Sequence, residues 1–200
     1  MKTVPAFIFL FLSFCANCYS QKVIVHAFME NKKATSNSDT IYYDFGKQLA
    51  WDDFQGKPDM NHFGGAVTAS GFAFDSEMNF DGKTVIINIS VHTYFSKKSS
   101  WKKPGINSAY HLLHEQHHFD ITRLGAEQLI EELSKAKFNE ENYRSMLNSI
   151  FEKTYRGNNQ LQLQYDGETS HSLNAEKQKE WNDRIATAIK KLGNQLAAAK

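Results

Sequence analysis

Cysteine, net charge and long apolar segments are all scarce in this sequence. The two cysteines of the 200-residue chain, Cys15 and Cys18, both lie near its N-terminus. The rest of the chain therefore has neither a disulfide bridge nor a thiolate metal site. After residue 21 no segment approaches the about 20 apolar residues that a membrane-spanning helix needs, so we expect no stable membrane insertion.

An excess of charge of one sign is missing as well. The chain has 23 lysines and arginines against 22 aspartates and glutamates, which gives a formal net charge of +1, and the two signs are interspersed. A protein that binds nucleic acid or an anionic membrane surface usually gathers basic residues on one face. The sequence indicates neither partner, and no pattern in it predicts an oligomeric state.

The first residues have the order of a secretory signal peptide. Lys2 precedes an apolar run over residues 4–14, and small and polar residues follow it. Cleavage after Ser20 fits this pattern best, whereas lipid attachment at either cysteine fits poorly because a phenylalanine or an asparagine would precede it. We expect residues 1–20 to be removed on export and residues 21–200 to form one domain, which is long enough for a single core.

Apolar and polar residues alternate in the first half of the expected domain. The alternation covers residues 23–27, 41–45, 67–73 and 87–93. Such segments predict strands of a sheet with one solvated face. The Asp81-Gly82 turn signal between the last two segments predicts that they form an antiparallel hairpin.

The apolar period becomes helical after Pro104 and Gly105. Ser108 can cap a helix that runs to about residue 136, and Asn139 can cap a second helix. A third helix is expected from about Asn174. With strands first and helices second, the predicted fold class is α+β, an antiparallel sheet followed by three helices.

A histidine-rich segment carries the strongest chemical signal. Residues 111–120 read HLLHEQHHFD, within which His114, Glu115 and His118 form the pattern H-E-x-x-H. Four residues make about one helical turn, so both imidazoles stand on one face and can bind one ion. Glu115 lies beside that face and can accept a proton from water, while a Zn²⁺ ion activates the water and polarises a carbonyl group. The pattern predicts a zinc-dependent peptidase, and the alternative is a surface cluster of histidines.

Two further residues of this segment are candidates for a role. His117 lies three residues after His114 and could pair with it, but its ring would point about 60° away from that of His118 and Glu115 would have no function. We interpret His117 as a neighbour of the site or as a surface residue. Asp120 could support the ligands by hydrogen bonding or could be solvated.

The third ligand is expected from elsewhere, because the first helix offers no suitable donor on the same face. Residues 165–174 read YDGETSHSLN and are expected to form a loop that holds Asp166, Glu168 and His171. His171 is the predicted ligand, Glu168 is the alternative ligand, and Asp166 could orient a ligating imidazole. Gly125, on the ligand-bearing face, would let this loop approach closely. The competing interpretation is a surface loop whose histidine is incidental.

Substrate binding is predicted in outline. In enzymes with this chemistry a peptide often pairs with a sheet edge, and residues 84–94 are the expected edge strand. Tyr94 and Tyr165 are both candidates for stabilising a negatively charged oxygen during the reaction. The sequence does not choose between them.

Five segments of the chain match a known pattern in order. They are LAWDDFQGKP (49–58), AVTASGFAF (66–74), SW (100–101), LLHEQHHFDIT (112–122) and YDGETSHSLNAEKQKEW (165–181). In them the chain resembles, over nearly its whole mature length, a bacterial family of predicted secreted zinc-dependent proteases, the domain of unknown function 922. The resemblance implies a zincin-like fold, bacterial export, and metal-site roles for His114, Glu115, His118 and His171. The family often has glycine after the last histidine, where this chain has Ser172.

Three functions are compatible with these observations. The first is a zinc-dependent endopeptidase that acts on peptides or proteins in the periplasm or outside the cell. The second is a non-catalytic zinc-binding protein of the cell envelope, and the third is a peptide-binding module without a metal. The presence of Glu115 favours the first, because histidines alone suffice for structural metal binding.

Overall fold

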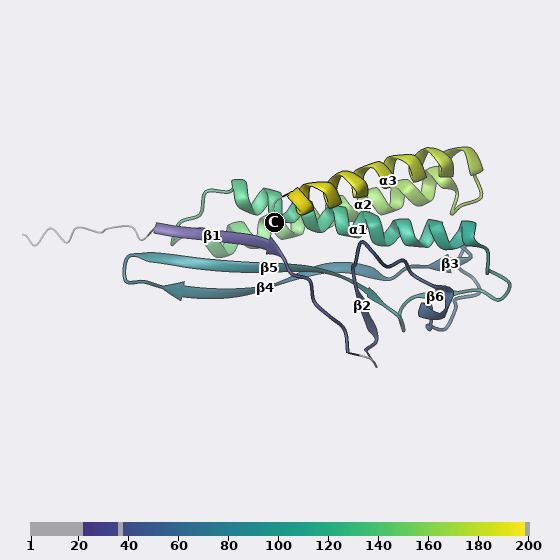
Figure 1. The fold of residues 1–200 in the computed structure, drawn as a ribbon, viewed down its shortest axis with the longest axis horizontal. Coiled ribbons are helices and arrows are strands. Elements are labelled where there is room, and N and C mark those ends of the chain that lie inside the picture. The colour runs from purple at the N-terminus through teal and green to yellow at the C-terminus, as the bar shows by residue number, and fades with distance from the viewer. Residues whose placement is uncertain (1–21, 36–37, 199–200) are drawn as a thin grey trace, which may run out of the picture.

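The computed structural model describes residues 22–35 and 38–198. It has the predicted α+β class, with a sheet in the first half of the chain and three helices in the second (Figure 1). The predicted signal peptide lies outside the described residues. The elements follow in the order β1 (Lys22–Met29), β2 (Thr40–Tyr42), the 3-10 helix η1 (Trp51–Asp53), β3 (Ala66–Val67), β4 (Ser70–Phe80), β5 (Thr84–Ser96), β6 (Trp101–Lys102), α1 (Ala109–Lys135), α2 (Tyr143–Thr169) and α3 (Ala175–Ala198).

The long strand β5 is the centre of the main sheet. β4 pairs with it in antiparallel register, from Ser70 opposite Phe95 to Phe80 opposite Val85. In the turn that joins them Gly82 has a φ of 87°, a left-handed conformation that glycine adopts without a steric penalty. The predicted hairpin is confirmed.

The other edge of β5 pairs with two strands in succession. β1 runs parallel to β5, with Lys22 opposite Thr84, and β2 is antiparallel to its last residues. The sheet is therefore mixed, and the prediction of a wholly antiparallel sheet is wrong, because alternation reports which face is buried and not the direction of a strand. Since β5 has partners along both edges, the expectation that residues 84–94 form a free edge for substrate is also wrong.

The helices lie over one face of this sheet (Figure 1). Alternate residues of β5 point toward them, and Ile87, Ile89 and Val91 form a buried core with Ala126 and Leu129 of α1. Burial of each large apolar side chain in such a core stabilises the fold by about 1.5–3 kcal/mol. The core holds α1 against the sheet and thereby fixes where its histidine-bearing turns point.

The helix boundaries agree with the sequence in part. Ser108 caps α1 as predicted, since its Oγ accepts the N–H of His111 at 3.2 Å. α2, however, continues to Thr169, so the first half of the predicted 165–174 loop is helical. Gly167 lies within this stretch, and a glycine there does not end the helix although glycine is a typical helix-ending residue. α3 begins close to the predicted residue, and no helix in the described ranges is both long and apolar enough to cross a membrane.

The packing of α2 on α1 corrects two further expectations. Asn139 does not cap α2, because its Oδ1 accepts backbone N–H groups in the turn before the helix. A Cβ atom at Gly125 would come within 2.4 Å of Asn158 Nδ2, which donates to the Ile121 carbonyl oxygen at 2.9 Å. Gly125 therefore admits helix α2 and not the predicted loop. This close approach places the C-terminal half of α2 beside the histidines of α1.

Candidate metal centre

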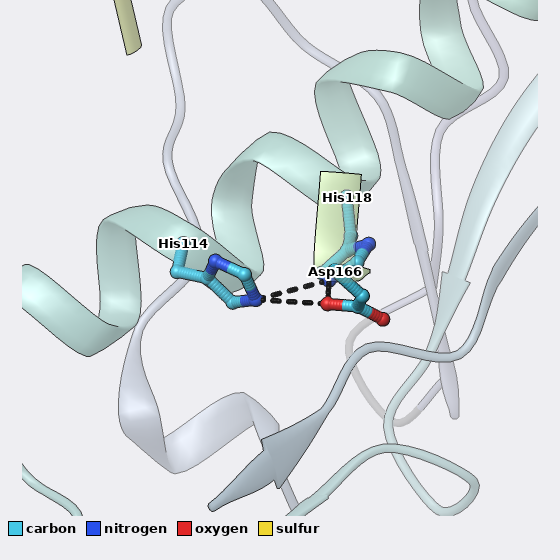
Figure 2. Close-up of side chains that lie close together, drawn as sticks. All are labelled: His114, His118 and Asp166. Atoms are coloured by element: carbon cyan, nitrogen blue, oxygen red, sulfur yellow. Dashed lines mark hydrogen bonds and ion pairs between the residues drawn. The ribbon is translucent and has the colours of Figure 1, made fainter. Parts of the chain in front are cut away.

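Two histidines of α1 and one aspartate of α2 meet at a single point (Figure 2). Asp166 Oδ1 lies 3.2 Å from His114 Nε2 and 3.0 Å from His118 Nε2. The two Nε2 atoms are 3.3 Å apart. The pair of histidines predicted from the motif is brought together, and Asp166, which the sequence suggested only as a support, completes the compact triad.

These separations fit a tetrahedral metal ion. Around an ion with bonds of about 2.0–2.1 Å, two ligand atoms at tetrahedral angles are about 3.3–3.4 Å apart. The three distances between the donor atoms of His114, His118 and Asp166 are 3.0–3.3 Å. Two imidazoles and a carboxylate are also a usual donor set for zinc. These residues would therefore hold a zinc ion without rearrangement of the helices.

The other ring nitrogen of each histidine is hydrogen-bonded to a glutamine. His114 Nδ1 lies 2.8 Å from Gln178 Oε1, and His118 Nδ1 lies 2.6 Å from Gln162 Oε1. An amide oxygen only accepts, so each Nδ1 must carry a proton, and each Nε2 is left free to bind a cation. This is the arrangement that orients histidine ligands in metal proteins.

The orientation of both amides is fixed by their second hydrogen bonds. Gln162 Nε2 donates to the carbonyl oxygen of His118 at 2.9 Å, and that oxygen can only accept. Gln178 Nε2 donates at 2.7 Å to the hydroxyl of Tyr165, which in turn donates to the carbonyl oxygen of His114. Neither amide can turn without losing a partner, so the histidine tautomers follow from the surrounding chain.

Electrostatics in the triad favour a positive charge. Burial raises the pKa of the Asp166 carboxyl, but hydrogen bonds from His114 and His118 outweigh this and hold that pKa well below its usual range. Burial lowers the pKa of His118, but the hydrogen bond to Asp166 and its charge outweigh burial and raise that pKa to about 9. The carboxylate of Asp166 thus stabilises a positive charge beside the two Nε2 atoms. A metal cation bound by the three residues would benefit from the same charge.

Glu115 lies beside the triad but outside it. Its side chain is buried, and Oε2 accepts a hydrogen bond of 2.8 Å from Thr68 Oγ1. Glu115, His118 and Asp166 line one cavity of about 250 Å³, together with residues of the segment 66–71. The structure thus places Glu115 beside His118 and Asp166, facing a space that a small group can enter.

His171 lies at the edge of the same cavity. Its Nδ1 is 3.3 Å from Asp166 Oδ1, and 29% of its side chain is exposed. The residues from Ser170 to Ser172 all have positive φ, of 49°, 50° and 71°. Such conformations are unfavourable for residues other than glycine and are found most often at functional sites. His171 is therefore beside the triad, in contact with Asp166 rather than with the other two histidines.

Glu168, the alternative third ligand, is not brought to the triad. Its carboxylate accepts hydrogen bonds from Trp181 Nε1 at 2.8 Å and from Gln164 Nε2 at 2.7 Å. It is exposed and faces α3, because helical spacing turns it away from Asp166. Its contacts join α2 to α3.

His117 and Asp120 form a separate buried pair. His117 Nδ1 lies 2.9 Å from Asp120 Oδ2, while Asp120 Oδ1 accepts hydrogen bonds from Tyr43 Oη and Gln116 Nε2, each at 2.8 Å. Burial, and next the charge of Asp120, raise the pKa of the Tyr43 hydroxyl. These contacts tie α1 to the segment after β2 and do not reach the metal triad.

Neither tyrosine suggested for stabilising a charged oxygen lines the cavity. Tyr165 is fully buried and stacks on the ring of His114, with centroids 4.6 Å apart. Tyr94 packs against Gly71, where a Cβ atom would come within 2.8 Å of its hydroxyl. Tyr165 instead helps to hold the histidine in place.

A second group of potential ligands lies on the outer face of the sheet. It consists of Glu30, Asp75 and His92. Lys32 Nζ is already 2.5 Å from Asp75 Oδ2 and 3.7 Å from Glu30 Oε2. Since this ammonium group is already paired with both carboxylates, we assign no metal to the group.

The hydrogen bond from Gln162 provides a direct test of the ligand arrangement. Gln162→Leu should lower zinc affinity by about 10–100-fold, the usual effect of removing a partner that orients a histidine ligand. Competition for zinc with a chromophoric chelator measures this, and circular dichroism checks the fold. Gln164→Leu is the matched control, because Gln164 is exposed, lies on the same helix and bonds only to Glu168. Equal affinities in the two variants would contradict the arrangement.

Comparisons of the chain with known protein families, with curated proteins and with solved structures find no match. The resemblance to the family of predicted zinc-dependent proteases therefore stays a prediction that rests on the five quoted segments. The geometry of the triad, the two glutamines and Glu115 is independent of that resemblance.

Proposed function

We propose that this chain is an exported zinc-dependent peptidase with a zincin-like architecture, as its resemblance to the bacterial protease family implies. His114, His118 and Asp166 hold the zinc ion, and Glu115 is the general base. The observation that carries the proposal is the buried carboxylate of Glu115, which lines one cavity with His118 and Asp166, two of the three residues whose donor atoms have tetrahedral spacing. When bound, zinc supplies a Lewis acid that activates water near neutral pH and polarises a carbonyl group.

Glu115 moves the protons of the proposed reaction. It accepts one from water and delivers it to the nitrogen of the departing amine, as a general base that then acts as a general acid. The hydrogen bond from Thr68 Oγ1 to Glu115 Oε2 leaves Oε1 for this exchange and keeps the carboxylate from turning. Burial among α1 and the segment before β4 limits the water around it, which strengthens its interaction with a polar substrate.

The second candidate is a non-catalytic zinc-binding protein of the cell envelope. One observation favours it: His171 Nδ1 lies 3.3 Å from Asp166 Oδ1, so His171 could supply a fourth ligand. A zinc ion with four protein ligands is typically structural, whereas a catalytic ion keeps an open position. The buried Glu115 supports the catalytic alternative, because a closed structural site has no use for an adjacent carboxylate.

Metal content and metal-dependent hydrolysis test the proposal together. The purified mature chain should contain about one zinc ion, and a chelator should stop its cleavage of an unfolded protein such as casein, with activity restored by added zinc. A variant with both His114→Ala and His118→Ala should contain none. A metal-free wild-type protein that stays metal-free in excess zinc would refute the proposal, and zinc binding without hydrolysis would favour the envelope protein.

A further inference from the structure

We propose that the site selects peptides with a bulky apolar side chain next to the cleaved bond, and that this side chain packs on α2 against Leu163. The inference rests on the proposed function and names its substrate class. It is drawn from the shape, charge and exposed side chains of the cavity that holds Glu115.

One stripe of α2 forms a wall of this cavity. The residues of α2 that line it are Tyr155, Asn158, Asn159, Gln162, Leu163 and Asp166. They recur at helical spacing, so they share one face of the helix over about 16 Å. The facing wall is the segment Ala66–Gly71. An extended peptide rises about 3.3 Å per residue, so a wall of this length contacts about five residues.

The acidic residues that line the cavity lie at the end of the wall nearest the triad. Among the lining residues the carboxylates are Glu115 and Asp166, both at the triad, and neither lysine nor arginine is present. A divalent cation would offset these two negative charges. Outside the triad the cavity therefore offers a charged substrate side chain no carboxylate, lysine or arginine as a partner, and burying a charge without an opposite charge is unfavourable.

Apolar side chains gather at the mouth of the cavity. Leu163 is 72% exposed and Tyr155 is 43% exposed, although both line it. Phe63, 73% exposed, lies against His171 with ring centroids 5.3 Å apart. Single exposed apolar residues are common, but a group around a polar reaction site gives a substrate an apolar surface to cover. Leu163 lies three residues before Asp166, about one turn of α2 from the triad, whereas Tyr155 lies about 12 Å further along the helix.

Two leucines of equal exposure allow a matched test. Leu163 lines the cavity, whereas Leu173 is 71% exposed and does not. We would compare Leu163→Lys with Leu173→Lys on quenched fluorescent peptides whose central bond is flanked by leucine or phenylalanine, or by glutamate. For the wild-type protein and for Leu173→Lys, kcat/KM should be at least about 10-fold higher on the apolar peptides than on the glutamate peptides. Leu163→Lys should lower kcat/KM on the apolar peptides by about 10-fold and leave kcat/KM on the glutamate peptides unchanged.

A binding measurement separates this inference from the peptidase proposal. Fluorescence anisotropy of the same peptides with zinc-loaded Glu115→Gln protein should show the same preference, with Leu163→Lys abolishing it. Selective binding without cleavage by the wild-type protein would support the apolar site and refute the peptidase. Cleavage without apolar preference, or equal behaviour of the two lysine variants, would overturn the inference and leave the peptidase standing. A protein that neither binds nor cleaves either series would overturn both.

Discussion

Glu115→Gln should lower the rate of peptide hydrolysis by at least about 10²-fold while zinc remains bound, because an amide cannot accept the proton that a carboxylate takes from water. The substitution preserves shape, and the amide oxygen can still accept the hydrogen bond from Thr68 Oγ1. Measuring kcat on an unfolded protein substrate beside the zinc content of each sample tests both parts. Since Glu115 is outside the triad, its loss should leave metal stoichiometry near one.

Glu168→Gln is the control for Glu115→Gln. Glu168 is an exposed carboxylate near the site in sequence but turned toward α3, so its substitution should leave both hydrolysis and zinc content unchanged. Unchanged hydrolysis in Glu115→Gln would defeat the assignment of a general base. Loss of zinc in Glu115→Gln would show instead that the carboxylate belongs to the ligand set.

The third ligand is tested by comparing Asp166 with His171. Removing a residue that only supports a metal ligand usually lowers metal affinity by about 10–100-fold. Asp166→Ala should lower zinc affinity by more than about 100-fold. His171→Ala should lower it by about 100-fold at most. The reason is geometric: Asp166 Oδ1 lies within 3.2 Å of both Nε2 atoms, while the aspartate is the one triad residue with which His171 pairs. Titration with a competing chelator measures each affinity.

A loss of zinc in His171→Ala as large as that in Asp166→Ala would change the interpretation of the site. If His171→Ala loses zinc as completely as Asp166→Ala, four protein ligands close the coordination sphere and the envelope-protein function is favoured. Asp166→Asn refines the comparison, because it keeps the size of the side chain and removes its negative charge. A zinc affinity close to that of the wild type in Asp166→Asn would show that charge at this position contributes little.

Local patterns predicted those parts of the structure that depend on neighbours in the sequence. The cap at Ser108, the hairpin around Gly82 and the pairing of His114 with His118 each follow from a few adjacent residues. The direction of β1 could not be predicted in this way, because the partner of Lys22 is Thr84, far along the chain. Alternation is identical in parallel and antiparallel strands whenever one face is solvated.

The third donor of the triad depends on tertiary packing. Asp166 reaches the histidines because it lies on helix α2, which extends to Thr169 and approaches α1 closely at Gly125. Gly167 favours the end of a helix, and packing of one face of α2 overrides that preference. Gln162 and Gln178 were missed for the same reason, because nothing distinguishes them from other glutamines until the helices are placed. For Gln162 the one local signal is its position four residues before Asp166. Gln178 has no such signal.

The left-handed turn from Ser170 to Ser172 connects α3 to the end of α2 that carries Asp166. Its backbone is held at both sides, since His171 N–H donates to the Asp166 carbonyl oxygen at 3.0 Å and the carbonyl oxygen of Ser172 accepts from Tyr110 Oη at 2.8 Å. So short and constrained a link cannot absorb a displacement of α3 by bending. Movement of that helix, whether from a mutation on its outer surface or from a bound molecule, would be transmitted to the imidazole of His114 through Gln178 and to the carboxylate of Asp166 through the turn.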